Sequence, residues 1–192
     1  HEVSLGYKDD TPDPSVFVRF PMSNEQDEAL DAAKSMGWSD SGWDGPTPSV
    51  LAWTTTPWTL TANLALAVAP KEEYALVASP DGSERLLLAA PRVEEVLGEG
   101  WTVQNSFKGS ELQGLRYEPP FVNATEHDGQ PYHHRVLPAD YVGMDDGTGV
   151  VHTAPAYGAE DNELGRAFNL PTVHTVDLQG VVTGDYPGSG KF

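Results

Sequence analysis

Short segments with strand character follow one another along most of this chain, and glycine or proline interrupts them before any grows long. The candidate strands cover residues 15–20, 50–55, 64–68, 74–78, 85–89, 101–107, 134–137 and 150–152. Pro70, Asp81-Gly82 and the glycines of residues 98–100 separate several of them. Short strands spaced by roughly 8–12 residues are typical of a sandwich or barrel. The pattern predicts an α+β, mainly β fold, with a β-barrel-like core and a few peripheral helices.

Three helices are expected outside this core. The run from Ser23 to Gln26 has the form of a capping box and predicts a helix that ends at Gly37. Its apolar face would hold Ala29, Leu30, Ala32, Ala33 and Met36. A short helix is predicted after Pro91, and a third from about residue 159 to 168. Residues 39–48 and 123–130 have loop composition, the first anchored by two tryptophans and the second expected to be mobile.

Charge and cysteine content exclude several functions. The chain has 192 residues, enough for one domain, and 29 acidic against 11 basic side chains give a net charge of −18. Such a surface repels phosphate backbones, which argues against sequence-independent binding of duplex DNA. Cysteine is absent, which removes disulfides, thiolate metal sites and cysteine nucleophiles. No apolar run approaches the roughly 20 residues of a membrane helix, and no secretory leader is recognisable.

The first stretch that suggests chemistry is Thr54-Thr55-Thr56-Pro57, followed by Trp58. Proline cannot donate to a ladder, so the strand must end or turn there. The threonine hydroxyls then lie at a strand end, where a polar ligand can hydrogen-bond to them. An edge strand capped by a turn, with the tryptophan in the core, explains the same residues without any ligand. Composition alone favours that structural explanation.

The second stretch runs from residue 146 to residue 161 through a glycine turn, an apolar strand, a Pro/Gly elbow and a helix start. Asp161 falls in the first turn of that helix, where the helix dipole favours an ionised carboxylate. Such a carboxylate suits recognition of a ligand ammonium group, although a helix cap is the commoner role. His152 lies on the apolar strand, where a histidine is more often a core residue than a catalytic one.

Other patterns do not meet the requirements of a known site. Gly147-Thr148-Gly149 lacks the third glycine of a dinucleotide site, and residues 188–191 lack the first glycine of a phosphate loop. His133 and His134 are adjacent, so in a strand they point to opposite faces and are poorly placed to share a metal. No Gly-x-Ser-x-Gly elbow is present. We therefore expect neither a cofactor nor a metal.

Together the two stretches resemble the editing domain of the class I isoleucyl-, valyl- and leucyl-tRNA synthetases, the connective-peptide insertion in their catalytic fold. Residues 53–60, then Asn63 and the run 64–70, look like the isoleucyl branch; Thr56 stands where the other branches usually carry arginine. Residues 147–161 match the second motif of the family, and residues 7–18 look like the segment that leads into the isoleucyl insertion. Thr61 departs from the proline that is common there.

The resemblance implies a hydrolase that removes valine wrongly attached to the isoleucine tRNA. A pocket built for isoleucine cannot strongly reject a ligand one methylene smaller, isoleucine against valine being the standard example. Asp161 would pair with the α-ammonium of the misattached amino acid. Thr54, Thr55 and Thr56 would bind the terminal adenosine and help to place the attacking water.

The remaining roles follow from the same resemblance. His152 and Trp58 would form the wall of the side-chain pocket and exclude isoleucine by bulk, and Asn63 would give a supporting contact. Water would be the nucleophile, because no activated Ser, Cys or Lys is recognisable. Catalysis would then rest on positioning and polarisation, aided by a ribose hydroxyl of the tRNA.

Several alternatives stay open at this point. A valyl-type domain would instead clear threonyl-tRNA, although Thr56 and Trp58 argue against it. A non-catalytic module would only dock the tRNA 3′ end, and a freestanding editing factor is conceivable. The resemblance implies one editing domain over residues 1–192, excised from a larger cytoplasmic synthetase and monomeric. Its partners would be the 3′-terminal aminoacyl-adenosine of tRNA(Ile) and the remainder of the synthetase, whose catalytic fold would bind ATP. The acidic chain alone should bind whole tRNA poorly.

Overall fold

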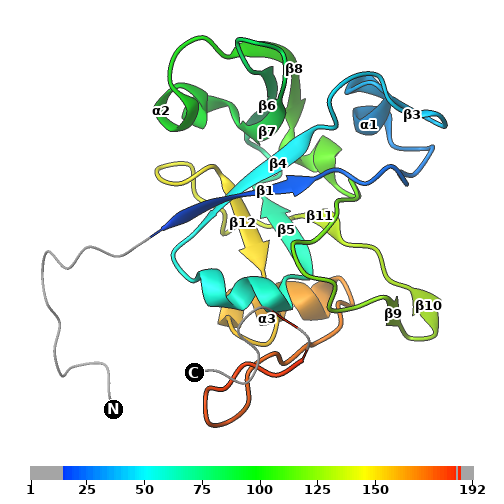
Figure 1. Ribbon diagram of the computed structural model, residues 1–192, viewed down its shortest axis with the longest axis vertical. Coiled ribbons are helices and arrows are strands. Elements are labelled where there is room, and N and C mark those ends of the chain that lie inside the picture. The colour runs from blue at the N-terminus through cyan, green and yellow to red at the C-terminus, as the bar shows by residue number, and fades with distance from the viewer. Residues whose placement is uncertain (1–14, 185, 187–192) are drawn as a thin grey trace, which may run out of the picture.

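The computed structural model describes residues 15–184 and 186 of the chain. The resemblance over residues 7–14 and the excluded phosphate loop at 188–191 fall outside these residues. In the described part the chain is mainly β, with short helices at the periphery (Figure 1). The mainly β, α+β prediction is therefore confirmed. Among residues 15–184, the strands form separate sheets around a shared core and do not close into a hydrogen-bonded barrel.

The largest sheet has five strands in the order β1-β4-β7-β6-β8. These strands are β1 (Val16–Pro21), β4 (Ser49–Thr54), β6 (Glu73–Ala78), β7 (Arg85–Ala89) and β8 (Thr102–Lys108). Neighbours are antiparallel except β4 and β7, which are parallel, and a bulge at Leu76/Val77 interrupts the pairing of β6 with β8. All five strands were expected from the sequence, within two residues at each end.

A second sheet has three strands in the order β11-β5-β12. They are β5 (Ala65–Val68), β11 (Arg135–Pro138) and β12 (Val150–Thr153), and β5 pairs parallel with β11 but antiparallel with β12. Both faces of β5 are buried. Leu66 and Val68 face the core shared with the large sheet, whereas Ala65 and Ala67 face a second core beneath α3 (Ala159–Ala167). The two-residue period of a strand thus serves two cores.

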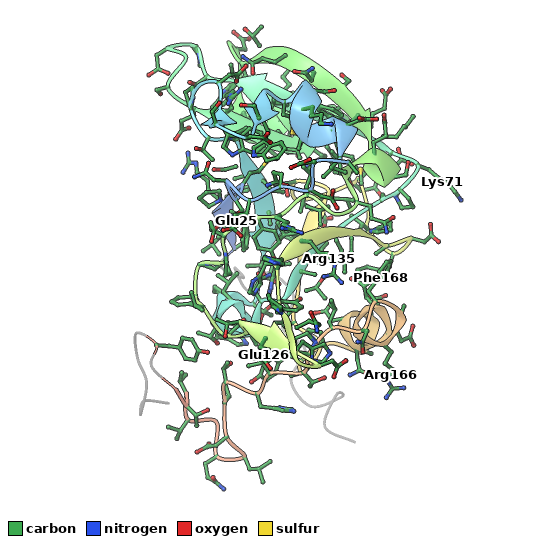
Figure 2. The ribbon with its side chains drawn as sticks, turned by 90° about the vertical axis from the view of Figure 1, so that its right-hand side faces the viewer. Glu25, Lys71, Glu126, Arg135, Arg166 and Phe168 are labelled. Atoms are coloured by element: carbon green, nitrogen blue, oxygen red, sulfur yellow. The ribbon has the colours of Figure 1, made fainter. Side chains whose placement is uncertain are left out.

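Short helices and hairpins complete the fold. The helices are α1 (Asp31–Ser35), α2 (Val93–Leu97) and the 3-10 turns η1 (Pro57–Ala62), η2 (Ala90–Arg92) and η3 (Gly109–Leu112). Two hairpins pair β2 (Trp38–Ser39) with β3 (Gly42–Trp43), and β9 (Glu126–His127) with β10 (Gln130–Pro131). Arg135 at the start of β11 donates to the carbonyl of Phe168 at the C-terminal end of α3, at 3.4 Å (Figure 2).

The first predicted helix begins later than the sequence indicated. Residues 23–26 do not form a capping box, and α1 starts only at Asp31. The Gln26 amide donates to the carbonyls of Ser23 and Arg116, and its oxygen accepts the Arg116 amide. These long-range bonds hold the segment against a distant part of the chain, so it cannot wind into a helix. Gly37 has φ of 92° just after α1, as predicted for its end.

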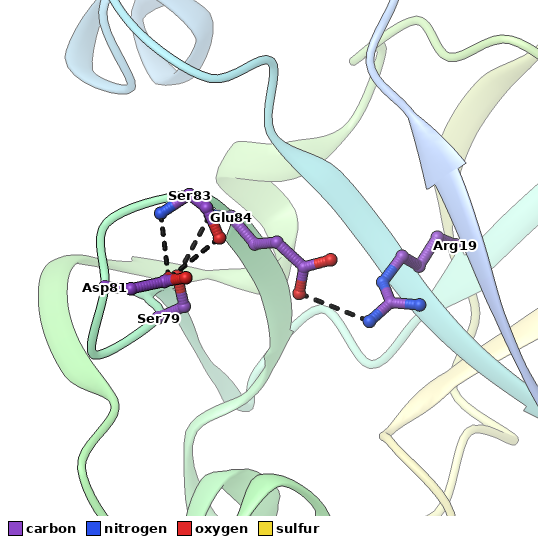
Figure 3. A network of polar contacts seen from close by, with 5 residues as sticks. All are labelled: Arg19, Ser79, Asp81, Ser83 and Glu84. Carbon is purple, nitrogen blue, oxygen red and sulfur yellow. Dashed lines mark hydrogen bonds and ion pairs between the residues drawn. The ribbon is translucent and has the colours of Figure 1, made fainter.

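The polar segment 123–130 is not simply a loop. It contains β9 and the first residue of β10, and the Asn123 amide donates to the carbonyls of Thr61 and Asn63. The polar composition did not reveal this hairpin, in which Gln130 pairs with His127 and Pro131, just beyond the segment, pairs with Glu126. The tight turn between β6 and β7 is stabilised by Asp81, whose carboxylate accepts hydrogen bonds from the Ser79 and Ser83 hydroxyls (Figure 3). Arg19 of β1 pairs with Glu84 beside that turn, at 3.2 Å.

Tyr74 holds the two sheets together. Its ring is fully buried in β6 of the large sheet, and burial raises its pKa. The hydroxyl accepts the Ala69 amide just after β5, at 2.8 Å, and donates to the Gly149 carbonyl just before β12, at 2.6 Å. One hydroxyl therefore satisfies two backbone groups that flank strands of the smaller sheet, and it fixes where β5 ends and β12 begins relative to β6.

Replacing Tyr74 with phenylalanine should lower the free energy of unfolding by about 1–3 kcal/mol, because an amide and a carbonyl would stay buried without a partner. Urea unfolding measures this change, and its denaturant dependence should stay constant. Tyr186→Phe is the matched control; its ring is partly exposed, so less than about 0.5 kcal/mol is expected. Equal stability of Tyr74→Phe and the parent would contradict the role.

Candidate functional site

The two sequence motifs meet at one pocket, although about 90 residues separate them. A cavity of about 590 Å³ is lined by residues of β4, η1, β12 and the start of α3. Residues of both motifs line it, together with one residue from the segment after α3. The lining residues are Trp53, Thr54, Thr55, Thr56, Trp58, Thr59, Val151, His152, Ala154, Tyr157, Gly158, Asp161 and Val176.

The threonine run forms one edge of this pocket through a local hydrogen-bond network. Thr54 is buried at the end of β4, and its hydroxyl accepts the Thr56 amide at 3.0 Å. The Thr56 hydroxyl lies 3.3 Å from that of Thr54 and 3.5 Å from that of Thr59. Pro57 then begins η1, since its fixed φ suits a first helical position. The strand ends where the sequence indicated, and the three threonines line the pocket as expected.

His152 is buried in β12, with 6% of its surface exposed. Its Nε2 lies 2.9 Å from the Thr59 hydroxyl, which donates its own proton to the Thr56 carbonyl at 2.8 Å. A hydroxyl has one proton, so Nε2 must be the donor and Nδ1 carries the lone pair. Nδ1 is buried without a hydrogen-bond partner. Burial lowers the pKa of His152 to about 4, so the ring is neutral at pH 7.

Asp161 lies half-buried in the first turn of α3 and faces the pocket. Its Oδ2 accepts the Ala154 amide at 2.8 Å, which bends the carboxylate back toward the end of β12. Burial raises the pKa of Asp161 and neighbouring Glu160 adds to the rise, while the Ala154 amide and the nearby Tyr141 hydroxyl oppose it. This rise in pKa runs against the effect expected of the helix dipole, which by itself favours the ionised carboxylate.

Gly158 gives Asp161 the room for this conformation. A Cβ at position 158 would lie 3.1 Å from the Asp161 carboxylate carbon. This glycine is also the residue before the first turn of α3, where its backbone is extended. The glycine of the elbow therefore permits the carboxylate to approach the strand end.

Two predicted site residues sit differently from the rest. Trp58 lines the pocket, but 62% of its surface is exposed, which places it at the rim. Asn63 is fully buried and does not line the pocket. Its amide donates to the Ala65 carbonyl, and its oxygen accepts the Tyr117 hydroxyl at 2.7 Å. Asn63 therefore fixes the chain between η1 and β5, behind the site.

No site role was predicted from the sequence for seven of the lining residues, and three of these take part in contacts that shape the pocket. Thr59 was quoted within the motif without a role, yet it is the partner of His152. Tyr157 was likewise within the second motif, and its hydroxyl accepts the amides of Thr175 and Val176. Val176 comes from a segment without regular secondary structure, so no periodicity could have marked it.

No cofactor or metal chemistry stands out in the described part of the chain. No group of three or more His, Asp or Glu side chains gathers there as a set of metal ligands. His134 is buried against the Asn63 carbonyl and Asn123, and burial lowers its pKa to about 4. His133 lines a smaller surface hollow together with Arg116. Among the described residues, no helix has the length and apolarity needed to cross a membrane.

Comparison with known proteins gives a consistent picture. No protein-family model matches the chain. Isoleucine–tRNA ligase of Dehalococcoides mccartyi is 43% identical over 210 residues, which cover 100% of this chain and 20% of that protein. The enzyme of Thermus thermophilus is 44% identical over 180 residues, 94% of this chain and 15% of that protein. The chain thus spans about a fifth or less of the length of these relatives.

Solved structures agree in fold. The cytosolic leucyl-tRNA synthetase editing domain of P. knowlesi superposes with a TM-score of 0.62 at 14% identity, over 81% of this chain and 63% of that one. Identity this low speaks for the fold alone, whereas the sequence relatives match along the whole chain. This chain is therefore homologous to a segment of isoleucine–tRNA ligases, and it has the fold of a class I synthetase editing domain.

Proposed function

We propose that the chain is the domain of an isoleucyl-tRNA synthetase that hydrolyses the ester of valine misattached to tRNA(Ile). The observation that carries the proposal is one pocket that joins a half-buried carboxylate, a neutral buried imidazole and a cluster of threonine hydroxyls. An amino acid ester offers a complementary ammonium group, an apolar side chain and a ribose. The single domain over residues 1–192 would act within a longer, cytoplasmic synthetase.

Asp161 is the proposed anchor of the substrate. Its carboxylate faces the pocket. Burial disfavours the negative charge of this carboxylate, and the positive charge of an α-ammonium group would compensate for that cost. The adenosine would lie along Thr54, Thr55 and Thr56, whose hydroxyls can both donate and accept. The end of the substrate is thereby fixed at two points.

His152 is proposed as a steric and polar wall, with no role as a general base. Its Nε2 already donates to Thr59, and its Nδ1 is buried away from solvent. With a pKa of about 4, the ring is also too weak a base to deprotonate water efficiently at neutral pH. Water positioned by the threonines and the substrate's own ribose hydroxyl would be the nucleophile.

The partner set follows from this arrangement. The domain would act as a monomer. The partner would be the aminoacyl-adenosine at the tRNA 3′ end, while the remainder of the synthetase would hold the tRNA body. Two alternatives predict different results in deacylation assays. One is a valyl-type domain that clears threonyl-tRNA, and the other is a module that docks the 3′ end without hydrolysis.

Asp161→Asn should lower kcat/KM for valyl-tRNA(Ile) roughly 10- to 100-fold, because a charged contact worth about 1.5–3 kcal/mol becomes neutral. Deacylation of valyl-, threonyl- and isoleucyl-tRNA is followed side by side. Wild-type activity in Asp161→Asn or Asp161→Ala would refute the ammonium contact. A preference for threonyl-tRNA would favour the valyl-type domain. Absence of hydrolysis with all three substrates would favour the docking module.

His152→Ala should make isoleucyl-tRNA a substrate, since it enlarges the pocket where the side chain would lie. The ratio of isoleucyl to valyl deacylation is the measured quantity. Thr102→Ala, on an exposed position of β8, is the control for nonspecific effects. The size-filter role fails if isoleucyl-tRNA stays intact with His152→Ala.

The activity should fall in acid as Asp161 becomes protonated. An aspartate contributes its charge above its pKa and loses it as the pH falls through that pKa. Because burial raises the pKa of Asp161, the loss should begin above the ordinary range of about 3.9. We expect this fall in kcat/KM at a higher pH than an ordinary aspartate would give, and its disappearance in Asp161→Asn. If Asp161→Asn shows the same fall of kcat/KM in acid, another titrating group is responsible for that fall.

A further inference from the structure

A chain of hydrogen bonds ties the wall of the pocket to η1. The Tyr157 hydroxyl accepts the Thr175 amide at 2.8 Å and the Val176 amide at 3.0 Å. It also lies 3.3 Å from the Thr175 hydroxyl, which lies 2.8 Å from the Thr61 hydroxyl. The Thr61 hydroxyl donates to the Trp58 carbonyl at 3.2 Å. Two lining residues and one rim residue of the pocket are therefore linked by two threonines outside it.

The number of hydroxyl protons fixes the direction of donation along this series of hydrogen bonds. Two amides occupy the lone pairs of the Tyr157 oxygen, so its own proton is left for the Thr175 hydroxyl. That hydroxyl then donates to Thr61, and Thr61 donates to the Trp58 carbonyl. Each of the three protons is used once, and hydrogen bonds aligned in this way strengthen one another.

Burial makes the linkage costly to break. Thr175 has 1% of its surface exposed and Thr61 has 9%, so their hydroxyls lie where solvent cannot easily replace a lost partner. Tyr157 is 38% exposed, with its ring toward the pocket mouth and its hydroxyl turned into the linkage. The segment around Val176 has no strand or helix to hold it there, apart from a single bridge between Val176 and Val182.

We propose that Thr61, Thr175 and Tyr157 form a clasp that fixes Val176 as one wall of the pocket and so determines which side chains fit. The clasp rests on the proposed function for its consequence, since size selection matters only if the pocket holds an aminoacyl group. Thr61 and Thr175 lie outside the pocket and act as positioning residues, whereas Tyr157 both lines the pocket and holds Val176 in place. Loss of the clasp lets the wall move outward and admits a larger side chain.

The test compares two variants that remove a hydroxyl of the clasp and nearly preserve the shape of the side chain with two control variants that leave the clasp intact. Tyr157→Phe and Thr61→Val each break the clasp, Thr61→Ser retains it, and Thr172→Val changes an exposed threonine of the same segment. In the first two, the ratio of isoleucyl- to valyl-tRNA deacylation should rise roughly tenfold, the scale of one net hydrogen bond. Thr61→Ser and Thr172→Val should keep the wild-type ratio. An unchanged ratio in both clasp variants, or an equal rise with Thr172→Val, overturns the proposal.

A second measurement separates the clasp from the proposed function. Amide hydrogen exchange at Thr175 and Val176 should be at least roughly tenfold faster in Tyr157→Phe than in the wild type, because both amides lose their acceptor. If the wild type hydrolyses no aminoacyl-tRNA, the proposed function fails while faster exchange still supports the clasp. Unchanged exchange at both amides overturns the clasp, whatever the activity.

Discussion

The antiparallel pairing of β5 with β12 is the constraint on which the site depends. Ala65 pairs with Thr153 and Leu66 with His152, and the Leu64 amide donates to the Thr153 carbonyl at 2.9 Å. Because β5 directly follows η1, this register brings the threonine motif beside the histidine of β12. A one-residue slip would turn His152 to the opposite face of its strand. Tyr74 and the two cores on either side of β5 keep that register in place.

Burial determines the electrostatics of the pocket more than the net charge of the chain. His152 is neutral and Asp161 is harder to ionise than an ordinary carboxyl group, both because water is excluded. The net charge of the chain is −18, and several of its cations are already engaged in ion pairs. Arg85 pairs with Asp44, and Arg92 pairs with Glu95, and both arginines are buried. The proposed function requires the domain only to receive one flexible nucleotide, and not to bind an RNA backbone.

The sequence predicted strands well and irregular segments poorly. Alternation and glycine or proline breaks located the β5 and β12 strands, and proline located the end of β4, because these signals are local. The helix predicted from Ser23 failed because Gln26 bonds to Arg116, a partner 90 residues away. Thr59 and Val176 were missed for a related reason: only the tertiary fold brings them to the pocket. Thr61, which departs from the usual proline, contacts no proposed ligand but supplies the hydroxyl that η1 contributes to the clasp.

The central claim is that the pocket binds an aminoacyl-adenosine through the carboxylate of Asp161. The most direct measurement is a crystal structure with a non-hydrolysable valyl-adenosine analogue bound. The account predicts the analogue's ammonium nitrogen within hydrogen-bond distance of Asp161, the valine side chain against His152 and Val176, and the ribose beside Thr54–Thr56. An ammonium group bound away from Asp161, or an analogue outside this pocket, would contradict it.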